Sequence, residues 1–423
     1  MKNMRRIAAL SVVASCAIAA SGCAGQAGPS SPGRQSPRPV VLTSSQVATL
    51  RAYGTGDTAF GLRLLSELCH GQPGSNMVLS PVSLATGLGM ASLGARGATA
   101  AAMAQVLRLP ATGSRLVDGL AARAALLGSL NRPGVTFAAS NRIWADPTLV
   151  TRARFVAELR SAYQAGLRHV PLLSRPEEAR RTINASVAAE TAGHIRELLP
   201  PSAMVPPPGW VLTDALYLKA AWAHPFDHAE TAPGSFSTGS GTVTAQYLNG
   251  GGFRTAKAAG WTAAALPYRG GRLTMLALLP PAAGRGGAGG CQVPAPSTLS
   301  TLATSMAAHG ANTAIALPKI NLAASESMRG PLTALGMGIA FSQGADFTGI
   351  SPQACCIGAV QHAATLAVGE KGTVASAATA VTLLPTAARA TPLSFNRPYL
   401  LVIRDTLTGE PLMLAWVANP VSR

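Results

Sequence analysis

Residues 373–384 read TVASAATAVTLL, and this stretch decides what kind of fold the chain makes. Gly372 precedes it and Pro385 follows it, yet the stretch itself contains no charged residue, Gly, Pro or Asn. Every side chain is small, β-branched or apolar, which is typical of a buried strand and not of an exposed loop. Extended at about 3.3 Å per residue, the stretch would span roughly 40 Å. Its composition fits both a resident central strand and a strand that is inserted later.

The rest of the chain has the composition of a large folded domain. Of its 423 residues, 48% are hydrophobic and 12% are charged, about half the usual charged share of roughly 25%, which excludes a disordered chain. Helical spacing comes early and strand-like runs come late, which predicts an α+β fold. Asp57 or Thr58 is expected to cap a first helix that ends at Gly71. Further helices are expected near residues 83–93, 99–107, 152–163 and 177–192, and strands near 210–218, 263–267, 273–279, 314–317, 364–368, 400–403 and 412–417.

Charge and catalytic motifs exclude several classes of function. The net charge is +17, but no run of five like charges occurs, so no nucleic-acid partner is expected. The sequence has no HExxH, Gly-x-Ser-x-Gly, Ser-x-x-Lys or phosphate-binding loop, which argues against an enzyme. His224 and His228 are four residues apart, but Pro225 breaks the helix that would align them as metal ligands. We expect no metal and no cofactor.

The sequence does not determine how the four cysteines of the expected domain pair. Cys355, Cys356 and His362 resemble a metal corner, whereas buried thiols or a disulfide with Cys69 or Cys291 are the simpler interpretation. Adjacent cysteines rarely bridge each other, for geometric reasons.

The N-terminus is typical of an exported protein. Lys2, Arg5 and Arg6 precede an apolar stretch, and Ala20-Ser21-Gly22-Cys23 resembles the lipobox of bacterial lipoproteins. We expect a signal peptide at 1–22, a lipidated flexible tether at 23–44 that anchors the chain to the extracellular face of the cell membrane, and one folded domain at 45–423. The alternative is an ordinary signal peptide and a secreted protein in which Cys23 is incidental.

Several separate motifs together carry a family resemblance. Residues 395–400 read FNRPYL, and the chain ends with 417–420, VANP. Upstream lie 76–83, NMVLSPVS, then 93–99, LGARGAT, and 214–219, DALYLK. With these motifs in this order, the chain resembles the serpin family over about residues 50–423. The resemblance implies an α+β fold with about nine helices around three β-sheets, an exposed reactive-centre loop and a monomeric protein.

The resemblance also assigns a role to the opening stretch. In serpins, a serine protease cleaves the reactive-centre loop, and the loop then inserts into the main sheet while the protease remains covalently attached. The implied function is irreversible inhibition of serine proteases; the alternative is a non-inhibitory serpin that acts as a binding or structural protein. The residues matching the hinge of this loop are Glu370, Gly372, Thr373, Val374, Ala375, Ser376, Ala377, Ala378 and Thr379. Val374 replaces the usual acidic residue and is expected to face outward.

Other matching positions form the shutter and the breach, which hold the main sheet closed in serpins. These positions are Ser80, Ser83, Asp214, Trp222, Lys319 and His362. Glu370 and Lys319 match a salt bridge at the top of the sheet. Asp214 stands where serpins usually have Asn, which predicts an Asp–His pair with His362 and a pH-sensitive shutter.

The scissile bond is assigned by counting along the loop. Counting from Gly372 places the cut after Thr386, and counting back from Phe395 places it after Ala387. These small residues favour an elastase-like or subtilisin-like protease. Alternatives are Ala388 and Arg389, of which the arginine would attract trypsin-like enzymes.

Overall fold

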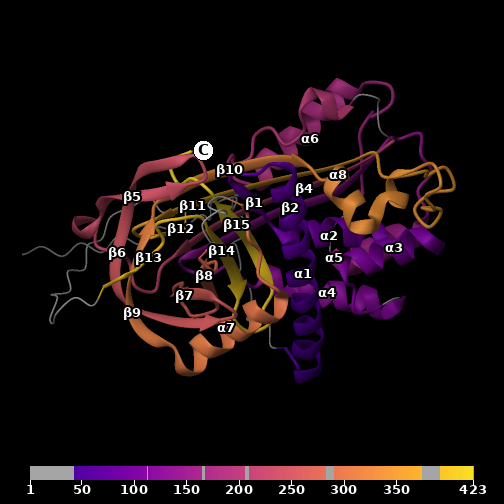
Figure 1. The fold of residues 1–423 in the computed structure, drawn as a ribbon. Helices are drawn as coiled ribbons and strands as arrows, with labels where there is room; N and C mark the ends of the chain where they lie inside the picture. The colour runs from indigo at the N-terminus through magenta and orange to yellow at the C-terminus, as the bar shows by residue number, and fades with distance from the viewer. Residues whose placement is uncertain are drawn as a thin grey trace, which may run out of the picture. The chain divides into compact units, whose positions relative to one another are not determined.

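The computed structural model describes residues 42–111, 113–163, 167–204, 209–282, 290–373 and 391–422. Within these ranges the chain forms an α+β fold, as expected (Figure 1). Its helices are α1 (Ser44–Gly71), α2 (Pro81–Ser92), α3 (Gly97–Leu107), α4 (Ser114–Gly128), α5 (Ala153–Tyr163), α6 (Pro176–Glu190), α7 (Pro296–His309) and α8 (Arg329–Leu332). Its strands are β1 (Met77–Leu79), β2 (Val135–Ala145), β3 (Arg168–His169), β4 (Trp210–Ala221), β5 (Ala232–Thr238), β6 (Gly241–Ala258), β7 (Trp261–Pro267), β8 (Leu273–Leu279), β9 (Ala311–Pro318), β10 (Ile320–Ser327), β11 (Ala359–Gly369), β12 (Gly372–Thr373), β13 (Leu393–Ser394), β14 (Tyr399–Asp405) and β15 (Pro411–Val417).

The strands of the described residues form two hydrogen-bonded sheets. One is six-stranded with the order β10-β11-β12-β4-β2-β3, and we call it the main sheet. The other is nine-stranded and runs β1-β15-β14-β8-β7-β6-β9-β13, with β5 added on β6. The resemblance implied three sheets; here two of them are joined, because the long strand β6 pairs with β5 over its first part and with β7 over its last.

Helices cover both faces of the main sheet. Val211 of β4 belongs to a buried cluster with Ile183 of α6, whereas the next residue, Leu212, belongs to the cluster that contains Leu88 of α2. Successive side chains of a strand point to opposite faces, so α6 and α2 lie on opposite sides of the sheet (Figure 1). The main sheet is therefore buried on both faces over most of β4, whereas Lys219 and Ala221 near the end of the strand are only partly buried.

The first helix begins earlier than its sequence predicts. Its N-cap is Thr43, which forms a capping box with Gln46, and the prediction of a cap at Asp57 or Thr58 is wrong. Asp57 lies inside the helix and is buried, where it pairs with Arg123 of α4. Glu410 contacts the same guanidinium nitrogen of Arg123, and burial together with the Asp57 carboxylate raises the pKa of Glu410 well above its usual range. Asp57 therefore belongs to a buried charge cluster and does not cap the helix.

Cysteine pairing is settled for one pair. Cys69 at the end of α1 and Cys291 before α7 form a disulfide, with 5.7 Å between their Cα atoms. Cys355 and Cys356 are both free thiols.

The described ranges contain neither a membrane-spanning helix nor a cluster of metal ligands. No helix in them is long and apolar enough to cross a membrane. In the same ranges, no group of three or more His, Cys, Asp or Glu residues is arranged to hold a metal ion.

Candidate functional site

The candidate site is the contact between β4 and β11 in the middle of the main sheet. At its lower end the two strands pair directly and in parallel, from Ala359 opposite Val211 to Ala364 opposite Leu216. Beyond this point the direct pairing stops. The two strands are therefore closed at one end and parted at the other.

At the upper end the short strand β12 lies between them. Its two residues, Gly372 and Thr373, pair with Ala221 and Ala220 of β4 on one side. On the other side they pair with the end of β11, where Thr373 lies opposite Val368. The polypeptide leaving β11 thus turns back at once and enters the sheet as its next strand.

Glycine is required at the point of entry. Gly372 has φ +148°, and a Cβ atom there would lie 2.1 Å from the carbonyl oxygen of Ala220. No real Cβ approaches a backbone atom so closely, so any larger residue would push β12 out of the gap.

The inserted residue Thr373 contacts Tyr268, which belongs to a stacked pair of aromatic rings. Thr373 is fully buried, and its Oγ1 lies 2.5 Å from the hydroxyl oxygen of Tyr268. The Tyr268 ring stacks on the Trp222 indole with 4.5 Å between centroids. The indole Nε1–H donates to the carbonyl oxygen of Gly369 at 2.9 Å, which ties Trp222 to the turn between β11 and β12.

Glu370, in the same turn, is the centre of a cluster of charged and polar side chains. Its Oε1 accepts from Lys319 Nζ at 2.8 Å and from the Thr231 hydroxyl at 3.2 Å, and it lies 3.2 Å from His228 Nδ1. Burial raises the pKa of Glu370, but the hydrogen bond from Lys319 and the other donors outweigh this effect and lower the pKa from 4.5 to about 2. Glu370 is therefore an ionised anchor of the upper end.

A buried polar cluster lies at the lower end. His362 of β11 is opposite Asp214 of β4 in the strand register, and both side chains are buried. The backbone N–H of Ser80 donates to His362 Nε2 at 3.0 Å, so this nitrogen carries no proton. The ring proton is on Nδ1, which donates to the Asp214 carboxylate.

The same cluster extends to α2 and β2. Ser80 is the N-cap of α2, and its side chain accepts from the Ser83 N–H. The amide nitrogen of Asn141 lies 2.7 Å from the second Asp214 oxygen and 3.0 Å from Ser83 Oγ, and because a carboxylate only accepts, the amide donates there. Asp214 thus receives donors from both His362 and Asn141.

The structure brings together the nine predicted residues that it describes. Ser80, Ser83, Asp214 and His362 form the lower cluster, and Trp222, Lys319, Glu370, Gly372 and Thr373 form the upper one. The remaining predicted residues lie outside the described residues: Val374, Ala375, Ser376, Ala377, Ala378 and Thr379 of the hinge, Thr386, Ala387, Ala388 and Arg389 around the scissile bond, and Cys23.

Sequence reasoning missed four residues of the two clusters. Asn141 completes the lower cluster, and Tyr268, His228 and Thr231 contribute to the upper one. Asn141 stands in a strand that the sequence did not predict. Leu266-Pro267-Tyr268 fits the family order, but nothing in the sequence shows that its tyrosine meets Thr373.

Comparison with known proteins gives the family. The family model for serpins, serine protease inhibitors, matches residues 55–420. The chain belongs to the serpin family.

Individual relatives cover nearly the same range. Serpin B6 of Macaca fascicularis is 30% identical over 384 residues, covering 85% of this chain and 97% of that protein. The leukocyte elastase inhibitor of Bos taurus is 29% identical, covering 88% of this chain and 100% of its own length. Among solved structures, human kallistatin has a TM-score of 0.74 at 25% identity, covering 90% of this chain and 100% of that chain. Human thyroxine-binding globulin, solved with its hormone, also has a TM-score of 0.74, at 23% identity over 88% of this chain and 100% of that chain.

Proposed function

We propose that this serpin is an irreversible inhibitor of serine proteases that works by loop cleavage and strand insertion. One observation carries the proposal: β4 and β11 are already parted at their upper end, and Gly372 and Thr373 occupy the gap as a first step of insertion. The chain that continues from Thr373 has the composition of a buried strand. A strand added between β4 and β11 would satisfy backbone groups that the parted strands leave without a ladder partner.

The alternation of side chains defines which loop residues must be small. Thr373 points into the core toward Tyr268, so in a continuing strand Ala375 and Ala377 share its face. Val374 would lie on the opposite face. An inward residue with a charge would be buried without a partner during insertion, whereas an outward charge would stay in water.

A matched pair of variants tests the proposal. Wild-type protein incubated with pancreatic elastase or subtilisin is expected to give a covalent complex that survives a denaturing gel. Ala375→Arg is expected to abolish the complex while loop cleavage continues, and Val374→Arg, which adds the same charge on the other face, is expected to retain it. Cleavage without complex in the wild type would favour the non-inhibitory alternative, a binding or structural role. Equal behaviour of the two variants would contradict the strand register.

The target class rests on the residues around the expected cut. Thr386 and Ala387 fit a shallow specificity pocket, and a bovine relative is named as an inhibitor of leukocyte elastase. Mass spectrometry of the peptide released from a denatured complex locates the bond. A new N-terminus at Ala387 or Ala388 supports elastase-like or subtilisin-like targets, and one at Ala390 would show cleavage after Arg389 and a trypsin-like target.

We further propose that the protein is exported, and anchored as a lipoprotein through Cys23. The disulfide between Cys69 and Cys291 supports export, because such bonds persist in oxidising compartments. Cys23→Ala is expected to move the protein from the membrane fraction to the medium, since a diacyl anchor holds where a single chain would not. Unchanged membrane association of the variant would contradict the anchor. The domain is expected to be monomeric.

A further inference from the structure

Two free thiols stand side by side in the segment that leads into β11. The sulfur atoms of Cys355 and Cys356 are 2.8 Å apart, about 0.8 Å more than the roughly 2.05 Å of a disulfide bond. Cys69 and Cys291 are already joined, so among the cysteines of the described ranges each of these thiols has its neighbour as its remaining partner. Only a small movement separates this pair from a bond.

The pair lines a cleft with polar walls. The cleft has a volume of about 570 Å³ and lies at the lower end of the main sheet, beside the first residues of β11. Polar residues that line it with the two cysteines are Ser202, Ser327, Arg329, Gln343, Gln353 and Gln361. Cys355 Sγ lies 3.1 Å from Gln343 Oε1 at the solvent-exposed side.

Arg329 supplies a positive charge in this cleft. Its side chain is exposed, and it makes no ion pair with any described residue; one guanidinium nitrogen donates to the carbonyl oxygen of Phe341 at 3.0 Å. Its charge acts on the Cys356 thiol. A guanidinium with free N–H groups beside two thiols is a binding point for a carboxylate on a molecule that approaches the sulfurs.

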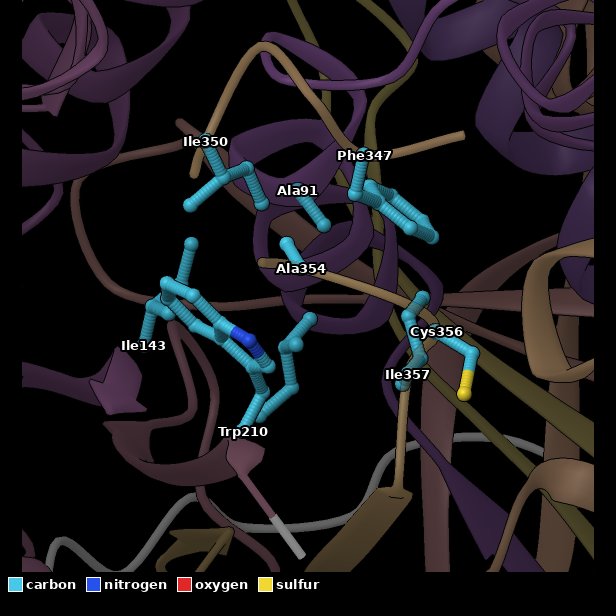
Figure 2. Close-up of a pocket in the computed structure, with 9 residues that line it drawn as sticks. Ala91, Ile143, Trp210, Phe347, Ile350, Ala354, Cys356 and Ile357 are labelled. Atoms are coloured by element: carbon cyan, nitrogen blue, oxygen red, sulfur yellow. The ribbon is translucent and has the colours of Figure 1, made fainter. Parts of the chain in front are cut away.

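The two sulfurs have different surroundings. Cys356 also borders a small apolar pocket with Trp210, Phe347 and Ile350, and in Figure 2 its sulfur points away from that ring of side chains. Burial, and then the hydrogen bond with Cys355, raise the pKa of Cys356 to about 11, so this thiol stays protonated at neutral pH. Both thiols are half-buried, and Cys355 is the one that lies against the exposed side chain of Gln343, so we assign the first reaction with a reagent from solvent to Cys355.

We propose that Cys355 and Cys356 form a redox-active dithiol site that reacts with small, carboxylate-bearing disulfides. Cys355 loses its proton to solvent, its thiolate attacks one sulfur of the disulfide, and the first small thiolate leaves. Cys356 gives its proton to that thiolate and attacks the Cys355 sulfur, which releases the second small thiolate to take up a proton from solvent. Two protein thiols are oxidised to one bond between neighbouring residues, and one disulfide is reduced to two small thiols.

The adjacent position of the cysteines makes this bond labile. A bond between neighbouring residues closes a small, strained ring, and strained disulfides are the readily reduced ones. The site is therefore expected to cycle under mild conditions that leave the bond between Cys69 and Cys291 intact.

Mass spectrometry of the full-length protein treated with oxidised glutathione tests the proposal. The wild-type peptide containing Cys355 and Cys356 is expected to become lighter by about 2 Da, the mass of two hydrogens, with only a transient glutathione adduct on Cys355. Millimolar reduced glutathione is expected to reverse the change. A persistent adduct in the wild type, or no reaction of either thiol in the folded protein, would overturn the proposal.

Three single variants separate the steps. Cys356→Ser is expected to accumulate a stable adduct on Cys355, and Cys355→Ser is expected to slow the first reaction by about tenfold or more. Arg329→Gln is expected to slow the reaction with oxidised glutathione by about threefold or more, but not the reaction with uncharged bis(2-hydroxyethyl) disulfide. Equal rates for Cys355→Ser and wild type would contradict the assigned order, and equal slowing with both disulfides would contradict carboxylate binding. Thermal denaturation checks that each variant is folded. Early trapping of the wild-type adduct with iodoacetamide, followed by mass spectrometry, shows which cysteine reacts first without the use of a variant.

Discussion

The lower and upper ends of the β4–β11 contact are held by different interactions. At the lower end, the strands pair directly and the side chains of His362 and Asp214 are 1% and 2% exposed. At the upper end, Glu370 and Lys319 are 15% and 37% exposed, and the gap holds β12. Ion pairs that water reaches contribute about 0–1 kcal/mol, whereas each buried polar group left without its hydrogen-bond partner costs about 1–3 kcal/mol. Separation of the two strands therefore begins at the top and is resisted at the bottom.

Removal of the buried histidine should have the largest effect. His362→Ala leaves two buried groups, the Asp214 carboxylate and the Ser80 N–H, without this hydrogen-bond partner, and at about 1–3 kcal/mol for each group we expect a loss of about 2–5 kcal/mol in the free energy of unfolding. Urea denaturation measures the loss. Asp214→Asn, which keeps the size of the side chain and removes its charge, is the matched control and should lose less. A loss of under about 1 kcal/mol in His362→Ala would mean that the buried cluster stabilises the lower end no more than an exposed ion pair stabilises the upper end.

Closing the entry to the upper gap should have the next largest effect. Gly372→Val would place Cβ against the Ala220 carbonyl, at a cost of about 1–3 kcal/mol typical of overpacking. The backbone N–H of Trp222, which donates to the carbonyl oxygen of Lys371 at 3.0 Å, is then expected to exchange its hydrogen faster with solvent. Gly369→Ala is the control, because a Cβ at that position meets no atom within 4 Å. Unchanged exchange in Gly372→Val would show that β12 does not depend on this glycine.

Acid should weaken the upper end through Glu370. Its pKa is about 2 in the folded protein against 4.5 ordinarily. Because the folded pKa is the lower one, ionised Glu370 stabilises the fold fully above pH 4.5, and this contribution is lost as the pH falls toward 2. Glu370→Gln should flatten the dependence of the thermal midpoint on pH in this window, and Lys319→Met should move the loss toward higher pH. Parallel curves for wild type and Glu370→Gln would contradict the assignment.

The indole hydrogen bond should make the smallest contribution. Trp222→Phe keeps an aromatic ring against Tyr268 but removes the bond from Nε1 to the Gly369 carbonyl, which predicts a loss of about 0.5–1.5 kcal/mol. Thermal denaturation measures it. A larger loss, similar to that of Trp222→Ala, would mean that packing and not the hydrogen bond holds this turn.

The elements that the sequence predicted well are those whose burial is uniform. Strands β14 and β15 are buried along almost their whole length, so their apolar runs are visible without tertiary information. Strands β6 and β10 alternate buried with exposed residues and contain Gly, Ser and Asn, so neither appears in the sequence as an apolar run that predicts a strand. The first helix was placed too late because Asp57 is a good capping residue, and only Arg123, far along the chain, makes it a buried partner.

The site was predictable only in part. The motif positions Ser80, Asp214 and His362 came from resemblance, and the structure shows how the strand register brings them together. Asn141 was missed because β2 itself was not predicted. The strand β12 is two residues long, and its pairing depends on a gap between strands that are distant in sequence, which no local pattern reveals.

The pairing of β1 with β15 determines when the domain can finish folding. Met77–Leu79 lies against Leu414–Trp416, and Asn76 bonds to the backbone of Ala418 and Asn419. During synthesis at about 5–20 residues per second, the roughly 330 residues between the two strands delay this contact by about 20–60 s. For that time the early strand has no neighbour on its sheet, and its buried apolar residues stay uncovered. We therefore expect the nascent chain to need a holding chaperone until its final strand emerges, and a truncation near the C-terminus would remove the only strand that pairs with β1 among the described residues.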